Sequence, residues 1–258
     1  MMMQREGRYI YCIIGASQER NFGPIGIGGR GDDVSTIGYN DLSMIVSSHP
    51  LAKLTVNSDN MLSHERVIEA VMKEFDGVLP VRFGTIASNA DEVRNLLGKR
   101  YGEFKNALKD MDHKVELGVK GVWKNMDVIF KEIVAENKAI KSTKENIQKE
   151  KHKKNIEAKM EVGKMVQKAL EKKKQKEAES IVDALRRTAF DYKLNKTIGD
   201  EMFVNAAFLV DKGREKEFDN IMDDLGEKYK EKVKFMYTGP LPVFNFVNIV
   251  IYPEAWEK

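Results

Sequence analysis

The sequence is poor in cysteine, proline and long apolar runs. Its 258 residues include one cysteine and six prolines. A lone cysteine forms no internal disulfide and is typical of the reducing cytoplasm, where we expect this protein to reside. Six prolines and 19 glycines exclude a collagen-like or proline-rich disordered chain. Since no apolar run approaches the ~20 residues that a membrane-spanning helix needs, we expect no membrane insertion.

Signatures of catalysis and metal binding are equally scarce. The four histidines are not spaced from one another as metal ligands are, and one cysteine cannot build a zinc cluster. Gly26–Gly31 matches the G-x-G-x-x-G pattern, but a dinucleotide site needs a helix directly after it, and residues 34–48 have the composition of strands. No nucleophile-elbow or P-loop pattern occurs. We therefore predict no catalytic residue, no metal site and no cofactor, and a loop at Gly26–Gly31.

Charge of both signs is abundant but unevenly placed. Lys and Arg number 43 against 40 Asp and Glu, a formal net charge of +3. Residues 131–180, however, hold 15 Lys and no Arg against 9 Glu and no Asp. Such a run either forms a solvated helix face, which its interspersed Glu residues favour, or attracts an acidic partner or nucleic acid. A nucleic-acid-binding adaptor is therefore the alternative function. The same helical segment is also a candidate surface for self-association.

Residues 1–123 mix the periods of strands and helices. β-Branched and aromatic residues predict strands at 8–15, 34–39, 42–48, 78–86 and 115–123. Apolar residues at helical spacing predict a helix at 60–75 with Gly77 at its C-terminal end. A second helix is expected to begin at Asn89, with Glu92 three residues later, and to bend near Gly98 before ending at about residue 111.

Residues 124–258 combine long helices with a small sheet. The stretch 124–192 contains no proline and one glycine, and its apolar stripe lapses near Ser142, which predicts a long helix or a helical hairpin. Residues 200–252 predict a small β-α-β-β sheet with strands at 202–210, 233–237 and 244–252, a helix at 213–228 and a turn at 239–242. The chain is therefore expected to be α+β, with two domains at 1–123 and 124–258 joined through the helical segment.

Two short segments have an unusual composition for the elements predicted there. Val78–Thr85 places Pro80 and Arg82 within an apolar strand-like run, and proline confines a strand to an edge, a terminus or a bulge. Arg82 either pairs with a carboxylate, for which Glu65 and Glu116 are candidates, or reaches the surface as part of a binding site.

The second segment, Gly239–Pro242, leads into the aromatic run Phe244–Val247 and is expected to form a rigid turn before a strand. Together the two segments supply the candidate partner-binding or structural residues, which are Pro80, Arg82, Phe83, Gly84, Gly239, Pro240 and Phe244.

These segments and several others resemble the gas vesicle protein GvpF/GvpL family. The most specific match is Leu79–Thr85, with the sequence LPVRFGT. The other matches, in order along the chain, are Tyr9–Ile14, Asp41–Ser47, His64–Glu69, Val115–Lys120, Trp123, Asn205–Val210 and Tyr237–Pro240. The sequence departs from the family at Leu241–Phe244, where Trp-Pro-Pro-Tyr is usual. The resemblance therefore assigns no contact role to an aromatic pair there.

The resemblance implies a non-enzymatic structural or assembly protein of gas vesicles, located in the cytoplasm with the vesicles. It implies two α+β domains, the first with a modified ferredoxin-like fold. The implied partners are the small apolar shell protein and other gas vesicle accessory proteins. A shell monomer with exposed apolar surface would aggregate unless another protein shielded it.

Overall fold

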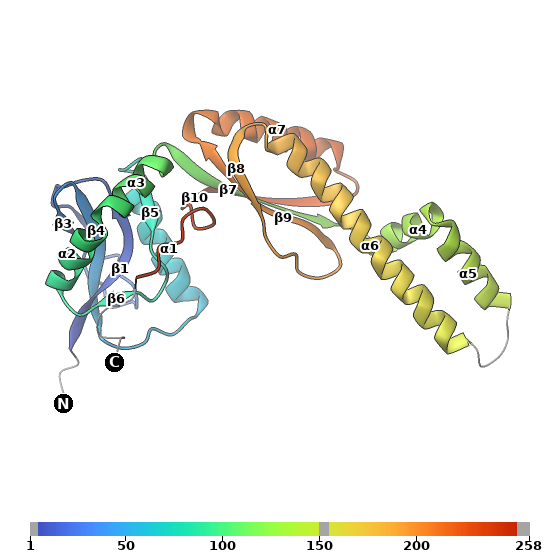
Figure 1. Cartoon of the computed structure of the whole chain (residues 1–258), viewed down its shortest axis with the longest axis horizontal. Coiled ribbons are helices and arrows are strands. Elements are labelled where there is room, and N and C mark those ends of the chain that lie inside the picture. Colours follow the sequence, from blue (N-terminus) through green and yellow to red (C-terminus); the bar gives the residue numbers. More distant parts are fainter. Residues whose placement is uncertain (1–4, 150–154, 252–258) are drawn as a thin grey trace. The chain divides into compact units, whose positions relative to one another are not determined.

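The computed structural model describes residues 5–149 and 155–251, which form two compact units (Figure 1). One unit comprises the chain up to Glu116, residues 211–213 and the segment from Gly239; the other comprises Leu117–Val210 and Arg214–Thr238. This division differs from the boundary expected after residue 123. Strand β7 (Lys114–Trp123) runs from the first unit into the second, and the C-terminal segment returns to the first.

The first unit is built on an antiparallel sheet with the strand order β2-β3-β4-β1-β5. Its strands are β1 (Glu6–Ile14), β2 (Asn21–Gly23), β3 (Val34–Tyr39), β4 (Leu42–Pro50), β5 (Val78–Pro80) and β6 (Ile86–Ala87). Both β5 and β6 pair with β1. The strands predicted at 8–15, 34–39 and 42–48 are confirmed, and Gly26–Gly31 lies in the loop between β2 and β3.

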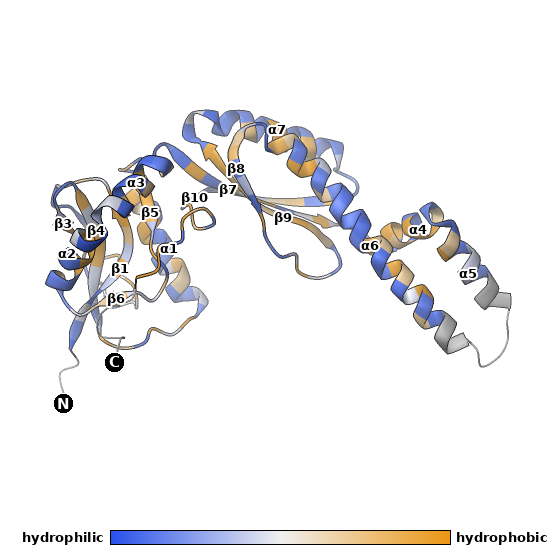
Figure 2. Ribbon diagram, viewed as in Figure 1, coloured by the Kyte–Doolittle hydropathy of each residue, from blue (hydrophilic) through white to orange (hydrophobic). Residues whose placement is uncertain are grey.

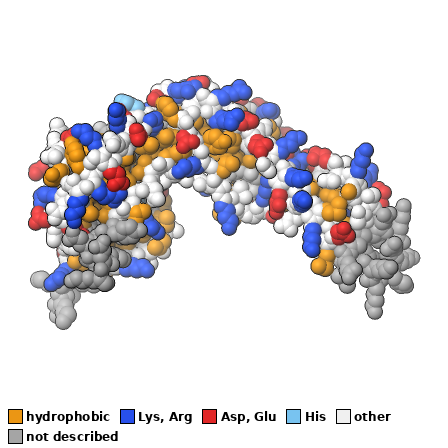
Figure 3. Space-filling model, in the orientation of Figure 1, with side chains coloured by type: hydrophobic (Ala, Val, Ile, Leu, Met, Phe, Trp, Pro, Cys, Tyr) orange, Lys and Arg blue, Asp and Glu red, His pale blue; other side chains and the backbone are white. Residues whose placement is uncertain are grey.

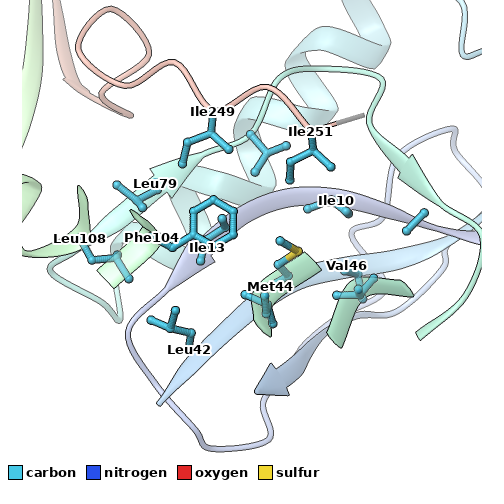
Figure 4. Packing of buried hydrophobic residues seen from close by; sticks show 14 residues of the cluster. Ile10, Ile13, Leu42, Met44, Val46, Leu79, Phe104, Leu108, Ile249 and Ile251 are labelled. Atoms are coloured by element: carbon cyan, nitrogen blue, oxygen red, sulfur yellow. The ribbon is translucent and has the colours of Figure 1, made fainter. Parts of the chain in front are cut away.

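Helices cover both faces of this sheet. α1 (Ser58–Met72) packs on one face, and α2 (Ala90–Lys99) and α3 (Tyr101–Met111) pack on the other. A register shift between Ile10 and Cys12 places Ile10 and Ile13 together in the α2–α3 core, which Figure 4 shows. The residues of β1 in the α1 core are Tyr9, Tyr11, Cys12 and Ile14.

The ends of these helices test the predicted caps. Asn89 is the N-cap of α2, and its side chain accepts a hydrogen bond from the Glu92 backbone N–H at 2.9 Å, as predicted. The expected bend near Gly98 is a full break at Arg100, which separates α2 from α3. The expected cap at Gly77 is wrong, because α1 already ends at Met72.

The second unit contains a four-stranded sheet with the order β10-β7-β9-β8. Besides β7, its strands are β8 (Ala189–Leu194), β9 (Met202–Asp211) and β10 (Val233–Leu241). Its helices are α4 (Met126–Glu136), α5 (Lys138–Lys149), α6 (Asn155–Leu185) and α7 (Glu215–Lys228), the last preceded by the 3-10 turn η1 (Lys212–Arg214). Figure 2 shows apolar residues in the strands and a largely polar α6.

The middle of the chain is a helical hairpin, in which α4 and α5 pack against α6. α5 begins at Lys138, four residues before the expected start at Ser142. The Lys173 ammonium lies 3.0 Å from the Glu132 carboxylate and 3.1 Å from that of Glu136. Positive and negative side chains are interspersed along this segment (Figure 3), as expected for a solvated helix face.

Three predictions in the second half of the chain are wrong. The helical stretch expected at 124–192 ends earlier, because its last residues belong to β8 and pair with β9. Gly239 and Pro240 lie within β10 rather than in a turn. Phe244–Ile251 is not a strand: residues 244–246 form a turn, and only Ile249 makes an isolated bridge, to Val81.

Candidate functional site

The LPVRFGT motif forms a loop extruded from the first sheet. The Val81 backbone N–H donates to the Tyr11 carbonyl at 2.9 Å, and the Ile10 N–H donates to the Thr85 carbonyl at 2.9 Å. Ile10 and Tyr11 are neighbours in β1, so residues 82–84 leave the sheet and rejoin it without interrupting the pairing on either side. The prediction of one continuous strand over residues 78–86 is therefore wrong.

The residues of this loop have different environments. Pro80 is buried as the last residue of β5. Arg82 is exposed, so the alternative that places it in a buried carboxylate pair is wrong. Phe83 is half-buried. Gly84 has a φ of +85°, a left-handed conformation that glycine adopts at no steric cost and that turns the chain back toward β6.

A buried hydrogen-bond chain holds the loop to the sheet and to α1. The Gly84 N–H donates to the Tyr9 hydroxyl oxygen at 3.1 Å, and that hydroxyl lies 2.9 Å from Nδ1 of His64. A hydroxyl both donates and accepts, so Tyr9 joins the Gly84 backbone and the His64 imidazole through one oxygen. His64 Nε2 makes no hydrogen bond of ordinary geometry with any residue that the structure describes.

Burial keeps both side chains neutral. Burial raises the pKa of Tyr9 well above its usual range, although the hydrogen bond from Gly84 opposes this shift. Burial lowers the pKa of His64 to about 4, and the nearby Val81 carbonyl offsets the shift only in part. His64 is 3% exposed, so the imidazole is a neutral core group at neutral pH.

Aromatic rings from the two candidate segments meet at His64. The Phe83 ring lies edge-on to the imidazole with a centroid distance of 5.7 Å, and the Phe244 ring lies 6.3 Å away. Tyr9 and Tyr11 complete the cluster, each with its ring centroid 5.6 Å from that of His64. Two motifs 161 residues apart therefore pack on one imidazole, with Phe244 still 41% exposed.

The C-terminal segment is anchored by a buried carboxylate. Glu116, 4% exposed, accepts hydrogen bonds from the Asn245 backbone N–H at 2.8 Å and from its side-chain amide at 2.5 Å. Arg100 donates to the Val250 carbonyl at 2.8 Å, and Ile249 lies in the α2–α3 core. Glu116 was a candidate partner of Arg82, but its carboxylate holds the backbone that carries Phe244.

The remaining candidates lie elsewhere, and one central residue was not predicted. Gly239 and Pro240 are exposed in β10. Neither belongs to the described aromatic cluster around His64. His64 itself was absent from the candidates. Its signal is in the sequence, because His64, Val67, Ile68 and Val71 share the spacing of one helix face, and all four are buried.

The arrangement packs four aromatic rings on one imidazole and leaves two side chains at the surface. Among the described residues, no group of three or more His, Cys, Asp or Glu side chains is placed to hold a metal ion. No helix in the described part of the chain is long and apolar enough to cross a membrane. The loop presents Arg82 at the surface, and the C-terminal segment presents one face of Phe244.

Comparisons with known proteins identify relatives over nearly the whole chain. The family described as gas vesicle synthesis protein GvpL/GvpF matches residues 7–248. Gas vesicle protein F1 of Halobacterium salinarum is 25% identical over 98% of this chain and 98% of its own length. Gas vesicle protein F of a Streptomyces species is 27% identical over 93% of this chain and 99% of its own.

Solved structures show the same fold. The crystal structure of GvpF from an Anabaena species superposes with a TM-score of 0.82 at 20% identity and covers 95% of this chain and 100% of its own. That of GvpF from Microcystis aeruginosa gives 0.78 at 20% identity, covering 94% and 99%. The predicted α+β class is confirmed. The placement of a ferredoxin-like fold in the first domain is wrong, because the β-α-β-β-α-β order of that fold occurs in the second unit, from β7 to β10.

Proposed function

Because the chain belongs to the family of gas vesicle synthesis protein GvpL/GvpF, we propose that it is a non-enzymatic structural or assembly protein that binds the apolar shell protein during vesicle formation. The match over residues 7–248 carries this proposal. The setting is the cytoplasm, where other gas vesicle accessory proteins are further partners and no cofactor is needed. The comparisons give no support to nucleic-acid binding, which we do not propose.

The physical task is to shield apolar surface until the shell subunit is added. An exposed apolar patch of several hundred Å² drives aggregation, and a folded partner prevents this by covering the patch. Such a partner needs exposed aromatic or cationic side chains on a rigid support.

Arg82 and Phe244 meet this requirement in the first unit. Arg82 stands on a loop that is hydrogen-bonded to β1 on both sides, and Phe244 is fixed through the Glu116–Asn245 bonds. Both side chains are exposed, whereas Phe83 and Gly84 are half-buried, Phe83 against His64 and Gly84 bonded to Tyr9. We assign the contact role to the exposed pair and a supporting role to Pro80, Phe83 and Gly84.

The test is co-expression of the chain with the shell protein, followed by pull-down. We expect capture of the shell protein and a loss of about tenfold or more when an exposed contact side chain is truncated, as in Arg82→Ala or Phe244→Ala. Arg187→Ala, an exposed arginine of the second unit, is the matched control and should retain capture. Circular dichroism and melting temperature show whether each variant is folded. Failure of the unaltered chain to capture the shell protein would contradict the proposal.

A further inference from the structure

The edge strands of the two sheets are protected unequally. An edge strand exposes unpaired N–H and C=O groups, and proteins block such edges with short strands, bulges or proline. Among the described strands, the end strands β2, β5 and β10 each carry a proline in or directly after them: Pro24, Pro80 and Pro240. β8 carries none. Of the strands that end the two sheet paths, β8 is therefore the one without a proline, and its regular part, Asp191–Leu194, is open to a further strand.

The side chains of β8 also favour pairing. Phe190 is 64% exposed and Leu194 is 62% exposed, which is unusual for large apolar residues of a strand. The pairing with β9 contains one bulge, between Ala189 and Asp191, and is regular from Asp191 to Leu194. This regular part presents a straight edge.

The backbone N–H of Tyr192, at the centre of β8, faces away from β9. The Asn195 N–H donates to the Asn205 carbonyl of the β9 side at 2.7 Å. Since alternate residues of an antiparallel strand face opposite sides, the N–H groups of Lys193 and Asp191 also face β9, and that of Tyr192 faces outward. The Tyr192 N–H donates instead to the Asp191 side chain at 2.8 Å. The outward N–H is thus held by a local contact that an incoming strand can replace.

We propose that β8 pairs with β8 of a second copy of this chain, antiparallel, with the two-fold axis at Tyr192. The sequence of the strand is self-complementary in this register. Asp191 lies opposite Lys193 of the second copy, and Phe190, the residue in the bulge, comes next to Leu194 of the second copy. Opposite charges and apolar pairs that face each other across an antiparallel pair are stabilising, whereas like charges are destabilising. A two-fold axis forms each pair twice.

A groove beside the strand supplies space for one of these side chains. It measures about 480 Å³, and its lining includes Leu194, Tyr192 and Val182 of α6. Phe190 of the second copy, next to Leu194, enters this groove. The dimer therefore combines backbone pairing with burial of an aromatic ring, and it involves β8 rather than the lysine-rich helical segment.

Sedimentation equilibrium of the whole chain, from about 1 to about 200 µM, tests the proposal across the micromolar range of weak association. We expect the mass to approach that of two chains at the upper end. Asp191→Lys alone and Lys193→Asp alone place like charges opposite each other, and each should raise the dissociation constant about tenfold or more. The double variant exchanges the two charges and should restore association.

A cysteine at the two-fold axis gives a second readout. Cys12 is fully buried, so Tyr192→Cys introduces the reactive thiol, and oxidation should give a covalent dimer on a non-reducing gel. Lys230→Cys, an exposed position away from β8, should remain a monomer. A chain that is monomeric at 200 µM overturns the proposal, and so does a double variant that associates no better than the single ones. Because no shell protein is present, this outcome is independent of the proposed function.

Discussion

The Tyr9 hydroxyl and the His64 imidazole share a buried hydrogen bond of 2.9 Å that links the central strand of the first sheet to α1. The same hydroxyl accepts from the Gly84 N–H, so the LPVRFGT loop rests on this pair. Phe83 and Phe244 then pack on the imidazole. The LPVRFGT loop is therefore supported by a histidine that lies outside it.

Tyr9→Phe removes the hydroxyl and leaves His64 Nδ1 and the Gly84 N–H without their partner. Unsatisfied buried polar groups cost about 1–3 kcal/mol, so we expect the free energy of unfolding in urea to fall by this amount. Tyr101→Phe removes a hydroxyl that binds Asp41 at the surface and should have a much smaller effect. Equal and small losses in the two variants would show that the Tyr9 bond is not a stabilising element.

The stability of the protein should fall in mild acid because of His64. Its pKa is about 4 in the folded chain against 6.5 for the free side chain, so between these values only the unfolded chain binds the proton. Stability therefore rises with pH through this window, and the contribution lost at low pH is up to about 3 kcal/mol.

Urea unfolding at pH 7.5 and pH 4.5 measures this dependence. His64→Phe removes the titrating group and should reduce the difference in unfolding free energy between the two pH values. His113→Asn changes an exposed histidine and should leave that difference unchanged. The assignment is contradicted if His64→Phe loses stability with acid as steeply as the unaltered chain.

Glu116→Gln should loosen the C-terminal segment. A carboxylate accepts both Asn245 bonds, but a glutamine presents one amide nitrogen to a donor, so one bond is lost at a cost of about 1–3 kcal/mol. Hydrogen exchange at the Asn245 and Phe246 amides should accelerate while exchange in β4 is unchanged. Unchanged protection at Asn245 would show that apolar packing alone holds the segment.

Lys173→Met should destabilise the second unit. The Lys173 side chain is 11% exposed and lies within 4.0 Å of the carboxylates of Glu132, Glu136 and Glu177. The Lys232 ammonium lies 3.0 Å from Glu132 and 2.9 Å from Glu177, so removing Lys173 leaves three carboxylates with one ammonium, at a cost of about 1–3 kcal/mol. Lys230→Met, at an exposed pair with Glu227, is the matched control and should have little effect on the melting temperature. Equal effects of both substitutions would contradict the account of this network.

Local sequence signals predicted those elements whose stability is decided locally. The apolar run at Tyr9–Ile14 predicted β1, and Asn89 with Glu92 predicted the start of α2, because composition and capping act within a few residues. The LPVRFGT segment was predicted to belong to one strand over residues 78–86, although its proline and arginine are unusual there. Its shape depends on hydrogen bonds to Ile10 and Tyr11, which the segment itself does not reveal.

The segments that were predicted wrongly owe their conformation to contacts with residues far away in the sequence. The residues from Phe244 have the composition of a strand, but Glu116, 129 residues from Asn245, binds the backbone and side chain of Asn245 and holds the segment in another conformation. β8 has a mixed polar composition and becomes a strand through pairing with β9. The role of His64 was detectable from its place in the buried stripe of α1, although its contact with Phe244 was not.

The most direct test of the central claim is vesicle formation in a gas vesicle gene cluster from which only this gene has been removed. Electron microscopy and pressure-sensitive turbidity count the vesicles, and reintroducing the gene is the control. The account predicts few or no vesicles without the gene, recovery with the unaltered chain, and reduced recovery with Arg82→Ala or Phe244→Ala at equal protein level. Normal vesicle numbers in the absence of the gene would contradict a role in assembly.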